Sequence, residues 1–250
     1  RANEDSYLAA SPVFLVADGM GGHEAGARAS AAVIAEFRRF VGTDSVDGDE
    51  VRAAIARART HVDALATDER AAGTTLTGVL LTRVGTARYW LAVNVGDSRT
   101  YRLADGELEQ ISVDHSVVQE LVESGELTPA EAATDRRRNI ITRAIGGSST
   151  GDADYWLFPA EEGDRILVCS DGITSELPDE RISEILSRVP DPQLAADALI
   201  AEALQSGGHD NITVVIVDAV RVSSRPGSGL ESDDFDIDVD TLPRAAGGVR

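Results

Sequence analysis

The stretch "VFLVADGMGGHEAG", residues 13–26, carries the strongest structural signal in the chain. Its first five residues are apolar, which predicts a buried strand over 13–17. Asp18 follows where such a strand leaves the core, and glycines and a methionine come directly after it. Because Asp bonds to its own backbone and Gly accepts positive φ angles, one Asp-Gly pair at a strand end predicts only a turn.

The same arrangement recurs along the chain. Asp97 follows the run "LAVNVG", Asp171 follows "ILVCS", and Asp210 precedes "NITVVIVDA"; each lies within two residues of a glycine. Four predicted buried strands therefore have a carboxylate at one end, which favours a site over four unrelated turns. Asp105, in "LADGEL", is different because it lies between two short strands, and there we expect a hairpin turn.

Carboxylates gathered at one edge of packed sheets would repel one another strongly in a partly dry cleft. Divalent cations offset that repulsion most simply. Oxygen ligands without a Cys or His cluster favour Mg²⁺ or Mn²⁺ over zinc. The neighbouring glycines let backbone and ions approach closely.

Composition excludes several classes of protein. The length of 250 residues and 42% hydrophobic content predict one large domain. A net charge of −20 argues against a nucleic-acid partner. All 23 basic residues are arginine, so no phosphate-loop, kinase or Schiff-base lysine exists. No apolar run reaches membrane-spanning length, so we expect no membrane segment.

Cys169 is the single cysteine, which excludes an intramolecular disulfide and a cysteine-built zinc site. This suits a reducing compartment, and we expect a cytoplasmic location. Because Cys169 lies within an apolar strand, it should behave as a small hydrophobic residue and not as a nucleophile.

Hydrophobic spacing predicts the order of elements. Helices are expected at 24–40, 49–69, 178–189 and 191–207. An antiparallel meander is expected over 74–84, 86–96 and 97–112, with further strands in 154–172 and 211–220. The polar stretch 114–139 predicts a mobile surface flap. A catalytic domain over 1–220 would then be followed by a disordered acidic tail or linker over 221–250.

Eight short motifs occur in one order along residues 3–217. They are "NEDS" (3–6), "VADGMGGHEAG" (16–26), "AGTTLTGVLL" (72–81), "NVGDSRTYR" (94–102), "DHS" (114–116), "ITRAIG" (141–146), "LVCSDGIT" (167–174) and "GGHDNITVVIV" (207–217). Together they resemble the metal-dependent, type 2C (PPM) serine/threonine protein phosphatases, most closely the bacterial branch.

The resemblance implies an α+β fold, a four-layer α-β-β-α sandwich of two antiparallel sheets flanked by helices. It also implies two to three Mn²⁺ or Mg²⁺ ions at one edge. Asp18 would bridge two ions, with the Gly19 carbonyl on one and Asp171 and Asp210 on the other. Asp18 and Asp171 would thus be catalytic through metal-bound water, which attacks the phosphomonoester in line without a phosphoenzyme.

The resemblance assigns further residues around these ions. Glu4 would act through water, Asp97 would hold a third ion together with Asp171, and Asn139 would approach that ion. The family places a phosphate-binding arginine four residues before the Glu of "NED", whereas Arg1 lies three before Glu4. Arg1 is therefore out of register, and the arginine can lie upstream of residue 1.

Met20 and His23 concern the general acid. Met20 stands where animal members carry a histidine, so water or His23 could protonate the leaving group.

The run Arg136–Arg138 could steer a phosphorylated substrate onto the flap, although such a run is usually a solvated face.

The family implies phosphoserine and phosphothreonine proteins as substrates and a bacterial serine/threonine kinase as the opposing enzyme; we expect a monomer. Two other classes stay open. A two-metal nuclease would use similar carboxylates, but the acidity of the chain argues against it. A catalytically weak member acting as a phosphoprotein-binding or scaffold module is the other alternative, although such members typically lose the metal aspartates.

Overall fold

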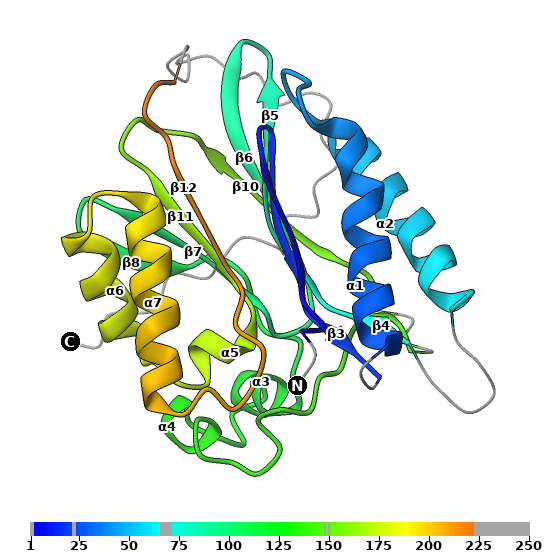
Figure 1. Cartoon of the computed structure of the whole chain (residues 1–250), viewed down its shortest axis with the longest axis vertical. Coiled ribbons are helices and arrows are strands. Elements are labelled where there is room, and N and C mark those ends of the chain that lie inside the picture. Colours follow the sequence, from blue (N-terminus) through cyan, green and yellow to red (C-terminus); the bar gives the residue numbers. More distant parts are fainter. Residues whose placement is uncertain (1–2, 22–23, 66–71, 148, 150, 223–250) are drawn as a thin grey trace.

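Two antiparallel sheets lie face to face at the centre of the fold (Figure 1). The computed structural model describes residues 3–21, 24–65, 72–147, 149 and 151–222. One sheet has the order β1 (Ser6–Ala10), β2 (Val13–Ala17), β5 (Leu76–Val84), β6 (Ala87–Val95), β10 (Asp154–Pro159). The other has the order β12 (Val214–Asp218), β11 (Arg165–Cys169), β7 (Arg99–Ala104), β8 (Glu107–Gln110).

Helices cover the outer face of each sheet (Figure 1). The five-stranded sheet packs against α1 (Glu24–Phe37), which a short 3₁₀ helix (Arg38–Phe40) extends, and against α2 (Gly48–Asp63). The four-stranded sheet packs against α6 (Asp179–Arg188) and α7 (Pro192–Ser206). These are the four layers expected from the motifs.

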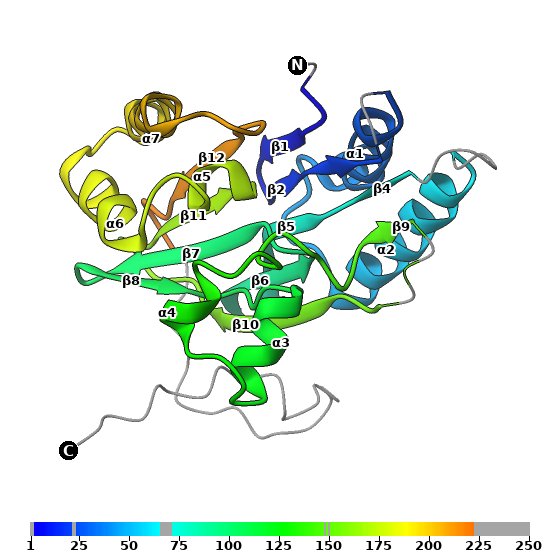
Figure 2. The same ribbon diagram turned by 90° about the horizontal axis from the view of Figure 1, so that it is seen from below.

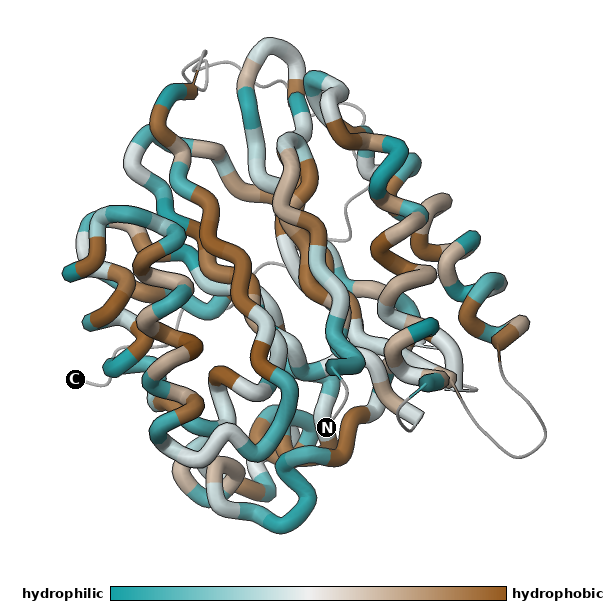
Figure 3. Tube along the Cα trace, in the orientation of Figure 1, coloured by the Kyte–Doolittle hydropathy of each residue, from teal (hydrophilic) through white to brown (hydrophobic). Residues whose placement is uncertain are grey.

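The facing sides of the two sheets form an apolar core of their own. Val79 and Trp90 of one sheet pack with Ile166 and Val168 of the other. The strands are largely hydrophobic, whereas the bends at the lower end of Figure 3 are rich in hydrophilic residues. Polar side chains therefore gather at one end of the sandwich.

Local sequence explains several boundaries. Asp47 caps α2 in a capping box with Glu50, and Asp191 caps α7 just before Pro192. Asp105 and its neighbouring glycine both have positive φ, 52° and 82°, in the turn between β7 and β8. The predicted hairpin turn is confirmed.

The segment 114–139 forms two short helices, α3 (Val117–Glu123) and α4 (Pro129–Ala132). They lie outside the helical layers (Figure 2), below α5 (Asp171–Thr174) in Figure 1. A small sheet of β3 (Gly19–Met20), β4 (Gly73–Thr74) and β9 (Ile145–Gly146) lies at the same end. Mobility of this flap stays a prediction.

Several boundaries differ from expectation. The helix expected over 49–69 ends at Asp63. The last strand begins at Val214 and not at 211, and Thr213, just before it, bonds to Ser170 beyond the end of β11. Strand β1 was not predicted. The tail from 223 onward lies outside the described residues. Among the described helices, none has the length and apolar character that a membrane crossing requires.

Candidate metal centre

Aspartates that follow or precede strands of both sheets lie close enough to interact electrostatically. Asp18 follows β2, and Asp97 lies in the crossing from β6 to β7. Asp171 begins α5 directly after β11, and Asp210 lies in the loop before β12. The charges of Asp97, Asp171 and Asp210 all raise the pKa of Asp18. The structure thus brings together the four aspartates chosen from the sequence.

Burial and mutual repulsion disfavour negative charge at this edge. Burial first, and then the charges of neighbouring aspartates led by Asp5, raise the pKa of Asp18 to about 10. Burial and the charge of Asp171 raise the pKa of Asp97 to about 7. Burial and the charge of Asp210 raise the pKa of Asp171 to about 6. Such a cluster binds positive charge, either protons or cations.

Asp5 belongs to the cluster although the sequence analysis did not select it. Its Oδ2 accepts hydrogen bonds from Ser170 Oγ at 3.0 Å and from Thr213 Oγ1 at 2.7 Å. Its Oδ1 is buried and has no hydrogen-bond partner among the described residues, and burial raises the pKa of the Asp5 carboxyl. The sequence signal was its place beside Glu4 in "NEDS", where we selected only the glutamate.

Glu4 lies against the start of α1, next to Gly19. A Cβ on Gly26 would stand 2.2 Å from Glu4 Oε2 and 2.8 Å from the Gly19 carbonyl carbon. Glu4 Oε2 is itself buried without a hydrogen-bond partner, and the Glu4 N–H donates to Asn211 Oδ1 at 2.8 Å. Only glycine at position 26 leaves room for this carboxylate.

We therefore expect Gly26→Ala to displace Glu4 and to weaken Mn²⁺ binding about tenfold, as loss of an outer-shell ligand partner does. Calorimetric titration of the metal-stripped protein measures this. Gly48→Ala is the matched control, because a Cβ there meets only Arg52 Nη2 at 3.9 Å. Equal Mn²⁺ affinity in both variants would contradict this account of Glu4.

The donor set fits hard divalent cations. Asp171 Oδ1, like Asp5 Oδ1 and Glu4 Oε2, is buried and has no hydrogen-bond partner in the part of the chain that the structure describes. Carboxylate oxygens of this kind are ligands that Mg²⁺ and Mn²⁺ prefer. Within the described ranges, no three acidic, His or Cys side chains already converge as a complete coordination shell does. Electrostatic coupling and unpartnered oxygens, and not a closed shell, identify the site.

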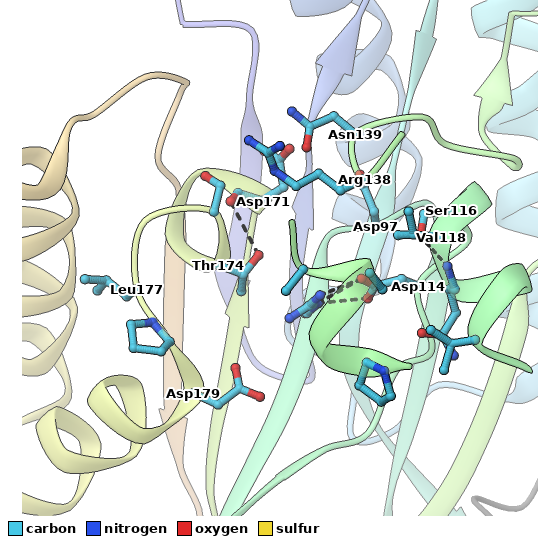
Figure 4. Close-up of a pocket in the computed structure, with 18 residues that line it drawn as sticks. Asp97, Asp114, Ser116, Val118, Arg138, Asn139, Asp171, Thr174, Leu177 and Asp179 are labelled. Carbon is cyan, nitrogen blue, oxygen red and sulfur yellow. Dashed lines mark hydrogen bonds and ion pairs between the residues drawn. The ribbon is translucent and has the colours of Figure 1, made fainter. Parts of the chain in front are cut away.

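A pocket of about 540 Å³ opens beside this edge and beneath the flap (Figure 4). Asp97, in the β6–β7 crossing, and Asp171, at the start of α5, line it on one side, and Arg138 and Asn139 line it from the flap. The role of Asn139 toward a third ion stays a prediction. Arg138, selected only as part of a charge run, is the flap arginine that reaches this pocket.

The start of the flap is fixed to the pocket wall. Arg99 Nε donates to both carboxylate oxygens of Asp114, at 2.9 and 3.0 Å, and Arg99 Nη2 donates to Asp114 Oδ2 at 2.7 Å (Figure 4). Such a bidentate pair holds position as well as charge. The pair ties the flap to β7, two residues after Asp97.

The histidines and Cys169 have structural surroundings. His115 is buried, bonded through Nε2 to Asp154 Oδ2 at 2.9 Å. His209 Nδ1 bonds to Glu176 Oε1 at 2.7 Å. Burial raises the pKa of the Cys169 thiol to about 12, which supports the prediction that it is no nucleophile. Arg1 and His23 lie outside the described residues.

Comparison with known proteins gives consistent matches. The family model "Protein phosphatase 2C" matches residues 2–205. The serine/threonine protein phosphatase PstP of Mycobacterium tuberculosis is 39% identical over 98% of this chain and 48% of its own length. The serine/threonine phosphatase Stp of Listeria monocytogenes is 33% identical over 83% of this chain and 84% of its own length.

A solved structure supports the same relation. The catalytic domain of PstP in complex with two manganese ions superposes with a TM-score of 0.75 at 37% identity, covering 88% of this chain and 92% of that one. The chain spans about half the length of the mycobacterial relative.

Proposed function

Because the chain belongs to the protein phosphatase 2C family, we propose that it is a metal-dependent phosphatase acting on phosphoserine and phosphothreonine proteins. The observation that carries this proposal is the cluster of buried carboxylates, with unpartnered oxygens, at the edge shared by both sheets. The relatives named above are serine/threonine phosphatases, and the manganese-bound neighbour supports Mn²⁺ or Mg²⁺ as cofactor.

Each residue has a proposed place. Asp18, the Gly19 carbonyl, Asp171 and Asp210 would hold two ions, and Asp97 with Asp171 would hold a third. Glu4 would act through water and Asn139 from the flap. Asp5 lies among these carboxylates and accepts hydrogen bonds from two hydroxyl groups.

When bound, two divalent cations lower the pKa of a water and neutralise phosphoryl oxygens. The residues of the chain supply the rest. The carboxylates hold the cations and give up the protons that their raised pKa values retain in the metal-free protein. The pocket under the flap seats the phosphorylated side chain.

We further propose an opposing bacterial serine/threonine kinase, a monomeric state and a cytoplasmic location. The buried free thiol of Cys169 suits a reducing compartment. Support for a phosphoprotein substrate comes from the relatives, which are serine/threonine phosphatases.

Arg138 gives a testable contribution to substrate binding. It lines the pocket, and among the described residues no hydrogen bond or ion pair engages its guanidinium, so it is available to a phosphate oxygen. We expect Arg138→Ala to raise KM for a phosphothreonine peptide at least about tenfold, the effect of losing one charge-assisted hydrogen bond. Arg136→Ala, which removes an exposed neighbour, should leave KM within twofold by the ordinary size of surface effects. Equal changes in both variants would mean general charge steering.

The proposed activity is tested with two substrates. Metal-stripped protein is assayed with and without Mn²⁺ on a phosphothreonine peptide and on an oligonucleotide phosphodiester. We expect Mn²⁺-dependent phosphate release from the peptide alone. Cleavage of the oligonucleotide would indicate a nuclease. Mn²⁺ binding without either reaction would indicate a phosphoprotein-binding module.

A further inference from the structure

Two pairs of buried hydroxyl groups join the sheets across the central core. Thr75 Oγ1 and Ser98 Oγ are 2.8 Å apart, and Thr77 Oγ1 and Thr100 Oγ1 are 3.0 Å apart. All four side chains are buried. The first pair lies just before β5 and β7, at the carboxylate edge, and the second lies two residues further into the same strands.

Thr75 also holds the Asp18 peptide. The Asp18 N–H donates to Thr75 Oγ1 at 3.0 Å, and the Thr75 N–H donates to the Asp18 carbonyl at 2.9 Å. Thr74 Oγ1 donates to the same carbonyl at 2.8 Å. Thr74 and Thr75 therefore hold both the N–H and the carbonyl of Asp18.

The other end of the link lies beside Asp97. Ser98 is its next residue, and Gly96 precedes it with φ 106°. The Gly96 N–H donates to His115 Nδ1 at 3.1 Å, and the Gly96 carbonyl accepts from the His115 N–H at 2.9 Å. A Cβ on Gly96 would stand 2.5 Å from Thr75 Cγ2. The Asp97 turn is thus packed and bonded against Thr75.

We propose that Thr75 and Ser98 are positioning residues that set the spacing between Asp18 on one sheet and Asp97 on the other. Neither hydroxyl touches substrate. The link acts through the peptides on which the carboxylates stand, and a cation site needs its ligands held to about 0.5 Å. This inference rests on the proposed function, in which both aspartates hold cations.

The Thr77–Thr100 pair provides a matched control. Thr75→Val and Thr77→Val each remove one buried hydroxyl of the same kind and size and leave one inter-sheet partner unpaired. We expect Thr75→Val to lose more thermal stability than Thr77→Val, because it also leaves the Asp18 N–H without its acceptor. Thr75→Val should weaken Mn²⁺ binding by calorimetry about 10- to 100-fold, as outer-shell changes do, and lower kcat more than it raises KM. Thr77→Val should bind Mn²⁺ like the wild type.

Two further variants separate the bonds. Thr75→Ser keeps the hydroxyl, so its Mn²⁺ affinity should lie within about threefold of the wild type. This is a smaller change than the 10- to 100-fold loss expected for Thr75→Val. Ser98→Ala leaves the Asp18–Thr75 bonds intact and cuts only the link between sheets; it should weaken Mn²⁺ binding less than Thr75→Val does. The double variant Thr75→Val/Ser98→Ala should be no worse than Thr75→Val alone, because both remove the same bond.

Wild-type Mn²⁺ affinity in both Thr75→Val and Ser98→Ala would overturn the inference, as would equal weakening in Thr77→Val. These affinities are measured without substrate. An inactive wild type that still shows the expected order of affinities would therefore refute the proposed function and retain the positioning role.

Discussion

Replacing Asp18 with Asn is expected to lower kcat at least about a thousandfold, because it removes the carboxylate proposed to hold two catalytic cations. The same change should raise the melting temperature of the metal-free protein. The pKa of Asp18 is about 10 in the folded protein against an ordinary value of 3.8. At neutral pH the protein therefore takes up a proton at Asp18 when it folds. The contribution of protonated Asp18 to the free energy of unfolding is complete below about pH 4 and is lost as the pH rises toward 10.

Asparagine is neutral throughout that pH range, so its burial does not require the uptake of a proton and its stability does not fall with rising pH for this reason. Thermal melts in EDTA between pH 5 and pH 9 should show the wild type losing more stability with rising pH than Asp18→Asn does. Asp105→Asn is the control, because it changes an aspartate in the β7–β8 hairpin turn and should leave turnover unaltered. Wild-type turnover in Asp18→Asn, or an unchanged pH slope, would refute the role assigned to Asp18.

Removing the metal should abolish hydrolysis, and Mn²⁺ should restore it while displacing protons. The raised pKa values of Asp18, Asp97 and Asp171 mean that these groups retain protons in the metal-free protein near and below neutral pH. Cation binding requires the ionised forms. Mn²⁺ affinity should therefore fall, and proton release should grow, as pH decreases from 8 to 6.

Calorimetric titration in two buffers of different ionisation enthalpy counts these protons. We expect at least about one proton released per protein at pH 7, from Asp18. Asp18→Asn should release fewer. Binding heats that do not depend on the buffer would contradict the protonation of the cluster.

Much of the fold could be predicted because local chemistry agrees with it. The apolar run before Asp18 forms β2, the Asp105 turn closes its hairpin, and Asp191 begins the last helix. The family and the four-layer fold are confirmed by the comparisons, whereas the activity of this chain stays a proposal. The division into a domain over 1–220 and a tail stays a prediction.

The remaining features depend on contacts between distant residues. Strand β1 forms because it pairs with β2, and its own short sequence does not indicate this pairing. Asp5 enters the site through Ser170 and Thr213, far along the chain. The four strand-end aspartates could be selected because each follows or precedes an apolar run, whereas the roles proposed for Thr75 and Arg138 rest on a contact with the other sheet and on a pocket. Such partners are visible only in three dimensions.

Cations are expected to bind at the edge where both sheets carry carboxylates. Crystals of the wild type grown with Mn²⁺ test it most directly, by anomalous scattering at the manganese absorption edge. We expect two strong peaks among Asp18, Gly19, Asp171 and Asp210, with a third beside Asp97. Peaks elsewhere on the molecule, or none at this edge, would contradict the account.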